Sequence, residues 1–593
     1  MTKLQQQYET LIQTYHFEDA FAQQSLTKLL REALASFVAA HREVALYCYG
    51  AHTKMMMADF MFELKPVHYI IDNYCSEQPE GGFEVIPERL IPEKGIDAAI
   101  LSSYKFKEPI KASLRAHHPN VAILDIYDVL EAQGLPLRGE YYRYGHPYHH
   151  YHRIHELHMA LEERESVEGW RALTQEFLQI KDFRLAKEAA LRMAAFSGAA
   201  GDRALAEAIA TLQEAELQVV RNLSRDHVVM ICMDGMRRRD VSREKMPQLT
   251  RVIEEKGLRF SEAYSYSTST YESLLPVFSQ NSDQRTEYFA QNTVAAESCS
   301  FVQEAIRERR SVHFYTDMED YITSDDIQHE QSFQTATQKL WSFVNDASEE
   351  PCGLYHLHIL YESHYTFSNP YTHGRFLSEG TAMLFDYLEK LGGKLRTDYV
   401  RQHDDALRYL DDTMAPFLAA LPCRAVLFAD HGNLVLPPGT ALADVDRNEL
   451  TCHQDWIEIP FVLFSPEYGA GEHQGVFSLM ALNDVVCSLM RKEHCPLSVR
   501  DHVKIGRSEL YNPDFRFLYE QMGEAHRLLA FEGFVFASGE KLVVYADGAV
   551  ELYQCSDESC VDDPARVREL LVRVRGEITV CTLDEIAERG NGE

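Results

Sequence analysis

Runs of apolar residues alternate with polar, helix-forming stretches along most of the chain. Over residues 1–40 the leucines recur at helical spacing, which predicts helices. Beyond them, four apolar runs read as buried strands, at 44–50, 67–72, 96–103 and 121–124. Strands that alternate with helices predict a parallel α/β sheet. We therefore expect residues 1–140 to form an α/β module.

The pattern changes three times after this module. Residues 141–225 are mostly rich in Ala, Leu and Glu with few breakers, which predicts a helical linker or bundle. Residues 226–505 contain further apolar runs with helical stretches between them, so we expect a large α/β sheet with helices on both faces. The runs lie at 228–233, 312–315, 354–360, 425–429 and 461–464. In residues 506–593, short runs separated by Ser538-Gly539 and Asp547-Gly548 predict antiparallel hairpins, followed by a helix at 564–575.

Composition narrows the classes of function. The net charge of −33 argues against a general nucleic-acid binder, which needs a basic face. No apolar run approaches the roughly 18 residues of a membrane helix, and the first residues show no secretory signal. We expect a cytoplasmic protein without a transmembrane segment. The 12 cysteines form no CxxC pair, so neither a zinc ribbon nor a disulfide framework is indicated. The oligomeric state stays open.

Carboxylates and a histidine follow two of the predicted strands. Asp234 comes directly after the run at 228–233, and Asp430-His431-Gly432-Asn433 follows the run at 425–429. Open α/β sheets bind ligands beyond the carboxyl ends of their strands. A carboxylate and an imidazole at one turn can share a metal ion. The alternative is an ordinary turn in which Asp430 caps the local backbone.

A hydroxyl-rich segment lies between these two positions. Residues 260–273 contain several Ser and Thr side chains and precede an apolar stretch, so we interpret them as a loop that enters a helix. A threonine at a helix entry could attack phosphorus if a metal lowers its pKa and the helix N-terminus helps to hold the anion. The alternative is an ordinary N-cap.

The order of these pieces resembles the alkaline phosphatase superfamily over residues 226–500. Within it, the closest likeness is to phosphoethanolamine transferases and lipoteichoic acid synthases. Met246-Pro247-Gln248-Leu249, Phe260, the segment 268–273 and Phe278-Ser279 follow the transferase order and spacing. That register implies Thr270 as the nucleophile, and the synthase pattern makes Thr268 the alternative.

The resemblance also implies further site residues. Asp234, Thr270, Asp430 and His431 are implied to bind one divalent ion, zinc or manganese. His364 and His453 are implied to bind the substrate phosphate or a second ion. His453, in Thr451-Cys452-His453, is similar to a segment of cofactor-independent phosphoglycerate mutases. His358 and Asp404 are weaker candidates of the same kind.

The implied activity is phosphoryl-group transfer from a phosphodiester or phospholipid-like donor to a hydroxyl acceptor, for which a glycan is one candidate. A phosphodiesterase or phosphatase would use the same site with water as the acceptor. A catalytically inactive scaffold or binding protein is the alternative of another class. Sulfatase activity is disfavoured because no Cys/Ser-x-Pro-x-Arg motif surrounds Thr270.

The first module resembles the Rossmann-like modules found beside sugar-modifying enzymes. Gly50 lies where a phosphate-binding turn would lie, and Asp72 where a ribose ligand would lie. The segment Gly50-Ala51-His52-Thr53-Lys54 lacks the GxGxxG fingerprint. We therefore favour a structural or docking role over nucleotide binding.

Overall fold

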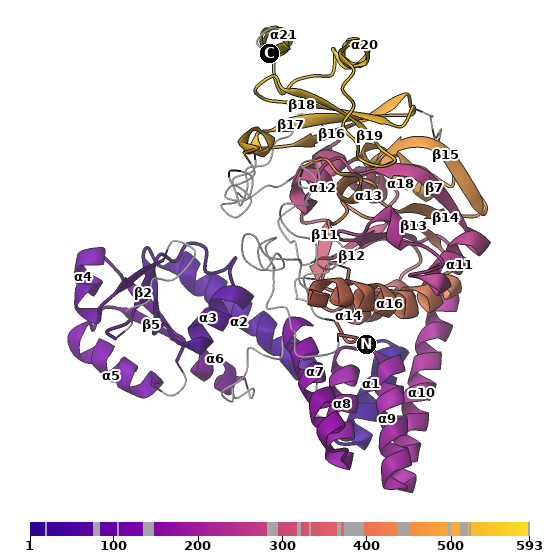
Figure 1. Ribbon diagram of the computed structural model, residues 1–593. Helices are drawn as coiled ribbons and strands as arrows, with labels where there is room; N and C mark the ends of the chain where they lie inside the picture. Colours follow the sequence, from indigo (N-terminus) through magenta and orange to yellow (C-terminus); the bar gives the residue numbers. More distant parts are fainter. Residues whose placement is uncertain are drawn as a thin grey trace. The chain divides into compact units, whose positions relative to one another are not determined.

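The computed structural model describes most of the chain in two compact units, one of residues 12–150 and one of residues 1–11 with 151–593 (Figure 1). Each unit is described by itself below. The residues that the structure describes are 1–17, 20–74, 83–103, 106–133, 147–281, 294–316, 322–330, 334–363, 369–372, 397–435, 451–495, 497, 500–509, 520 and 523–590.

The unit of residues 12–150 is built on a five-stranded parallel sheet in the order β3-β2-β1-β4-β5. Its strands are β1 (Val44–Tyr47), β2 (Tyr69–Ile71), β3 (Glu84–Ile86), β4 (Ala98–Leu101) and β5 (Ala122–Asp125). One apolar core joins the sheet to α2 (Ala20–Ala40), α3 (Ala51–Asp59) and α6 (Ile126–Ala132). A second core joins its other face to α4 (Ile91–Lys94) and α5 (Lys107–His117). The predicted parallel α/β sheet is confirmed.

The second unit begins with a group of helices. They are α1 (Lys3–Thr14), α7 (Pro147–Glu163), α8 (Val167–Gln179), α9 (Phe183–Ser197) and α10 (Ala200–Arg221). Ser166 and Asp182 start α8 and α9 as N-caps, each accepting a hydrogen bond from a backbone N–H of the first turn. Tyr8 of α1 packs against Phe183 and against Trp341 of α14 (Ala336–Glu349). The first helix therefore packs with the second unit.

An eight-stranded sheet forms the centre of the second unit, in the order β11-β9-β12-β6-β13-β14-β7-β15. Only β14 among these strands runs antiparallel to its neighbours. The strands are β6 (Val228–Met233), β7 (Gly257–Tyr264), β9 (Ser311–Tyr315), β11 (Ile327–Glu330), β12 (Gly353–Ile359), β13 (Arg424–Phe428), β14 (Phe461–Phe464) and β15 (Gly471–Ser478). This mostly parallel sheet confirms the predicted fold class.

Helices cover both faces of this sheet (Figure 1). On one face α12 (Thr270–Ser279) and α13 (Ser300–Arg307) pack with α18 (Leu482–Arg491). On the other, α11 (Pro247–Lys256) packs with α16 (Thr397–Ala420), and α14 packs on β12. The short helix α17 (Gln454–Ile457) precedes β14, and a separate two-stranded sheet joins β8 (Val294–Ala295) to β10 (Ile322–Thr323).

The hydroxyl-rich segment differs from its interpretation as a loop. Its first part, up to Tyr264, belongs to β7, so the loop prediction is wrong there. Several positions of the strand are only partly buried, and these include polar side chains such as Ser261 and Glu262. Backbone pairing with β14 and β15 holds this segment as a strand, and such long-range pairing leaves no periodic signal in a short polar stretch.

The C-terminal region folds into a four-stranded antiparallel sheet of β16 (His502–Arg507), β17 (Phe531–Phe536), β18 (Glu540–Tyr545) and β19 (Val550–Gln554). Gly539 and Gly548 have positive φ in the two hairpin turns, which favours glycine. The predicted hairpins are therefore confirmed. One face of this sheet packs α20 (Pro564–Val574) and α21 (Leu583–Gly590), and the other faces Tyr264 and Ile457. Among the described residues, no helix has the length and apolar character needed to cross a bilayer.

Candidate metal and phosphoryl-transfer site

Two neighbouring parallel strands bring the carboxylates and the histidine together. β6 and β13 pair side by side, with Cys232 opposite Phe428. Asp234 follows β6 directly, and Asp430 and His431 follow β13 after one residue. Because parallel strands end at the same edge of a sheet, the three side chains meet there. One ligand atom from each lies within 4.8 Å of the others, and all three residues are buried.

Two glycines allow the strand ends to approach each other. Gly235 has φ +65°, and a Cβ there would lie 2.2 Å from Asn433 Nδ2, which donates a 2.8 Å hydrogen bond to the Gly235 carbonyl. A Cβ on Gly432 would lie 1.9 Å from the carbonyl oxygen of Asp455. The two turns are thus tied to each other and to the start of α17. Asn433, the last residue of the Asp-His-Gly-Asn turn, therefore links the turn after β13 to the turn after β6.

Hydrogen bonds orient the ligand atoms. His431 Nδ1 lies 2.6 Å from the Gly432 carbonyl and donates its proton there, so Nε2 keeps its lone pair for a metal. Asp430 Oδ1 accepts from the backbone N–H groups of Gly235 and His431, at 3.1 and 2.9 Å. Its Oδ2 accepts no hydrogen bond from the residues that the structure describes. Buried carboxylate oxygen and imidazole nitrogen are the donor set that zinc and manganese accept, so the residues present fit such an ion.

The electrostatics of the three side chains also favour a cation. Burial, and then the nearby Asp234 carboxylate, raise the pKa of Asp430. Burial opposes protonation of His431, but Asp430 and Asp234 outweigh it and raise the pKa of this imidazole. Two buried carboxylates this close repel each other, and a bound cation relieves that repulsion.

Thr270 begins α12 directly against these side chains. Its Oγ1 donates a 3.0 Å hydrogen bond to Asp234 Oδ2 and lies 3.3 Å from His431 Nε2. The N-cap is Ser269, whose side chain makes no cap hydrogen bond within the described part of the chain. Thr270 is therefore a first-turn residue whose hydroxyl points to the carboxylate and imidazole, and the structure gives these contacts to Thr270 rather than to Thr268. The partial positive charge of the helix N-terminus suits a phosphoryl anion here.

His358 supports Asp234 from the neighbouring strand β12. Its Nε2 lies 3.2 Å from Asp234 Oδ2, and its Nδ1 lies 3.3 Å from Thr316 Oγ1. It is buried behind the carboxylate that Thr270 also contacts. Ser273 is a further residue that the motifs did not reveal, since its Oγ donates a 2.6 Å hydrogen bond to the Asp430 carbonyl. Its position one turn after Thr270 on α12 is the signal that points to it.

The remaining predicted residues are His364, His453 and Asp404. His364 is outside the residues that the structure describes. His453 is the N-cap of α17, and its Nδ1 accepts a 3.0 Å hydrogen bond from the Asp455 N–H. A neutral ring that accepts at Nδ1 carries its proton on Nε2, so this geometry suits a hydrogen-bond donor better than a metal ligand. Asp404 is mostly exposed and pairs with Lys245 at 3.5 Å.

The chain is similar to several solved structures. No protein-family model matches the chain, and no curated protein does. The solved structures that resemble it include a protein in the alkaline phosphatase superfamily from Vibrio parahaemolyticus, with 12% identity and a TM-score of 0.37, over 60% of this chain and 92% of its own. Because the TM-scores lie below 0.5, these likenesses carry no functional conclusion by themselves.

Three of these structures illustrate the range. A 2-O GAG sulfatase shares 11% identity with a TM-score of 0.43, over 62% of this chain and 92% of its own. A phosphonate monoester hydrolase of Agrobacterium radiobacter shares 10% identity with a TM-score of 0.39, over 59% and 95%. The soluble domain of lipooligosaccharide phosphoethanolamine transferase A from Neisseria meningitidis shares 16% identity with a TM-score of 0.30, over 45% and 88%.

Proposed function

We propose that this chain is a metal-dependent phosphoryl-group transferase, similar to phosphoethanolamine or phosphoglycerol transferases, with Thr270 as its nucleophile. The observation that supports it most is the position of the Thr270 hydroxyl between Asp234 Oδ2 and His431 Nε2 at the start of α12. A nucleophilic hydroxyl needs a neighbouring group that takes its proton and a positive environment for the phosphoryl oxygens. Both are present at this helix end.

The residues that would hold the ion are Asp234, Asp430 and His431, with zinc or manganese as the candidate metals. When bound, such an ion lowers the pKa of a coordinated hydroxyl and balances negative charge on a phosphoryl group. His358 on β12 holds Asp234 in place. The Gly432 carbonyl holds His431 in the tautomer that exposes its Nε2 lone pair.

The proposed reaction has two steps. In the first, Thr270 Oγ1 forms a bond to phosphorus while the bond from phosphorus to the donor's leaving oxygen breaks, and the hydroxyl proton moves toward Asp234 Oδ2. In the second, an acceptor hydroxyl bonds to phosphorus and releases its proton to solvent, the bond to Thr270 Oγ1 breaks, and the proton held by Asp234 Oδ2 returns to this oxygen. The donor's leaving oxygen takes up a proton from solvent. His453 is proposed to donate a hydrogen bond from Nε2 to a phosphoryl oxygen. The donor would be a phosphodiester or phospholipid-like compound, and a glycan is one candidate acceptor.

A trapping experiment tests this proposal. Protein loaded with zinc or manganese is mixed with bis(4-nitrophenyl) phosphate and quenched in acid, and the peptides are analysed by mass spectrometry. We expect a 4-nitrophenyl-phosphoryl group on Thr270, together with release of 4-nitrophenol. Release without an adduct, with water as the acceptor in a single step, would instead indicate a hydrolase without a threonine intermediate. No release with either metal would favour the scaffold alternative.

A further inference from the structure

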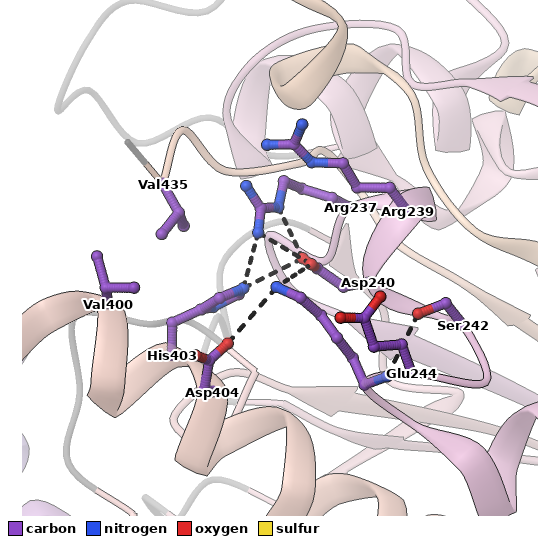
Figure 2. A pocket seen from close by; sticks show the side chains of 10 residues that line it. Arg237, Arg239, Asp240, Ser242, Glu244, Val400, His403, Asp404 and Val435 are labelled. Carbon is purple, nitrogen blue, oxygen red and sulfur yellow. Dashed lines mark hydrogen bonds and ion pairs between the residues drawn. The ribbon is translucent and has the colours of Figure 1, made fainter. Parts of the chain in front are cut away.

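A charged pocket lies in the second unit, and its lining includes residues that follow Asp234 and His431 closely in the chain. It has a volume of about 330 Å³, and Figure 2 shows the side chains that line it. The lining includes the side chains of Arg239, Glu244, Lys245, Val400, Asp404 and Val435. A volume near 300 Å³ is at the small end of ligand sites, enough for one ring-sized group.

The pocket and the metal site share two segments of the chain. Arg237, in the pocket wall, comes three residues after Asp234, and Val435 comes four residues after His431. The segments are also joined through Asp455, whose carboxylate accepts hydrogen bonds from Arg237 and Arg239 and whose carbonyl packs on Gly432. The pocket wall is therefore tied to the two turns that carry Asp234 and His431.

The inner wall of the pocket is a buried and rigid network. Arg237 binds both carboxylate oxygens of Asp240, at 2.7 and 2.9 Å, and lies 3.0 Å from His403 Nε2 (Figure 2). Although burial opposes its ionisation, His403 and Arg237 hold the pKa of Asp240 below its usual value. These charges compensate each other, so the wall presents a fixed surface without a large net field.

The outer part of the pocket offers charged groups of both signs. The side chains of Arg239 and Asp404 are 57% and 54% exposed, and Lys245 bridges Asp240 and Asp404 at 3.2 and 3.5 Å. The lining contains three cationic side chains and three carboxylates, so it has no net formal charge. A strongly anionic ligand gains little from such a field, whereas a hydroxyl can both donate to carboxylates and accept from Arg and Lys.

Two valines complete the lining on the side opposite Asp240. Val400 and Val435 are drawn across the pocket from Arg237 and Asp240 (Figure 2). Apolar surface on one side and paired donors and acceptors on the other match a ring that carries C–H groups on its faces and hydroxyls at its edge.

We propose that this pocket binds an uncharged, hydroxyl-rich group, a sugar or another polyol, of the acceptor. The proposal rests on the transferase function proposed above. Bound here, the acceptor presents one hydroxyl to the neighbouring metal site, while Asp404, Glu244 and Arg239 hold its other hydroxyls. These residues then determine which acceptor competes with water.

The first test measures the partition between transfer and hydrolysis. The metal-loaded protein turns over bis(4-nitrophenyl) phosphate with methyl β-D-glucopyranoside, its uronic acid counterpart or ethanol as the acceptor. We expect the glucoside to be preferred over ethanol at equal hydroxyl concentration by about tenfold or more, and over the uronic acid. Asp404→Asn and Glu244→Gln should each lower the ratio of transfer to hydrolysis several-fold. The control Glu255→Gln, in an exposed pair with Arg251 on α11, should leave the ratio unchanged.

The second test measures binding without turnover. Saturation-transfer difference NMR follows methyl β-D-glucopyranoside with the wild type and with Asp404→Asn. Weaker binding to the variant supports the pocket even if no 4-nitrophenol is released, in which case only the transferase proposal fails. Equal binding to both proteins, preference for the uronic acid, or a transfer ratio that the pocket variants do not change would overturn the inference.

Discussion

Thr270 Oγ1 donates a 3.0 Å hydrogen bond to Asp234 Oδ2 across a separation of 36 residues in the sequence. The bond joins the first turn of α12 to the end of β6, so it depends on how the helix sits against the central sheet. The same hydroxyl lies 3.3 Å from His431 Nε2 at the end of β13. The proposed nucleophile, proton acceptor and metal ligand are thereby brought together from three parts of the chain.

Replacing Thr270 should separate chemistry from folding. We expect Thr270→Ala to lower turnover of bis(4-nitrophenyl) phosphate by at least about 1000-fold, because no hydroxyl remains to attack phosphorus. Thr270→Ser should keep part of the activity, and Thr268→Ala should keep most of it. Steady-state kinetics check the rates, and circular dichroism checks the fold. Full activity in Thr270→Ala would exclude it as the nucleophile, and loss in Thr268→Ala alone would move the assignment there.

The metal content should depend on His431. Inductively coupled plasma mass spectrometry of untagged protein should find close to one equivalent of zinc or manganese, and His431→Ala should lose most of it because one of the three buried ligands is gone. A chelator should lower the melting temperature of the wild type, since an ion that binds only the folded state stabilises it. His473→Ala, on β15, serves as a histidine control and should retain the metal. Equal metal content in wild type and His431→Ala would contradict the assignment.

Gly432 should tolerate no side chain. Its Cβ would lie 1.9 Å from the Asp455 carbonyl oxygen, so Gly432→Ala must push the start of α17 away from the metal-site turn. We expect a loss of more than about 3 kcal/mol in the free energy of unfolding, or failure to fold, together with weaker metal binding. Urea denaturation measures the first effect. Gly201→Ala is the matched control, because this helical glycine has open space around its Cβ and the change should stabilise by about 0.5 kcal/mol. A stable, metal-binding Gly432→Ala protein would show that the turn is not so tightly packed.

The free energy of unfolding should decrease as the pH is lowered, because His453 becomes protonated. Burial first, and then Lys541 and the nearby arginines, lower the pKa of His453 to about 4, while Glu558 acts in the opposite direction. An unfolded histidine has a pKa near 6.5, so between these values the unfolded state binds more protons than the folded state. The contribution is therefore complete above about pH 6.5 and is lost as the pH falls toward 4.

The difference between wild type and variant isolates this effect from other titrating groups. From pH 7 to pH 4, we expect the unfolding free energy of the wild type to fall by about 3 kcal/mol more than that of His453→Gln. Urea unfolding at several pH values measures both proteins. Parallel pH dependence in the two would show that His453 titrates normally in the folded protein.

Much of the architecture follows from the sequence alone. Val228–Met233 and Phe461–Phe464 are uninterrupted apolar runs that become fully buried strands with the predicted bounds, because only burial on both faces satisfies such runs. The positions of Asp234 and of the turn that begins at Asp430 directly after apolar runs likewise indicated the edge of the sheet where they lie.

The tertiary structure decided the rest. It selects the hydroxyl that meets Asp234, because the direction of α12 turns Thr270 and not Thr268 toward the carboxylate. It makes β7 a strand through pairing with β14 and β15, and it places Asp404 at an exposed pocket rather than beside the metal ligands. Local patterns determine which residues are buried, whereas strand order, helix direction and side-chain proximity arise from contacts between distant segments that no local pattern encodes.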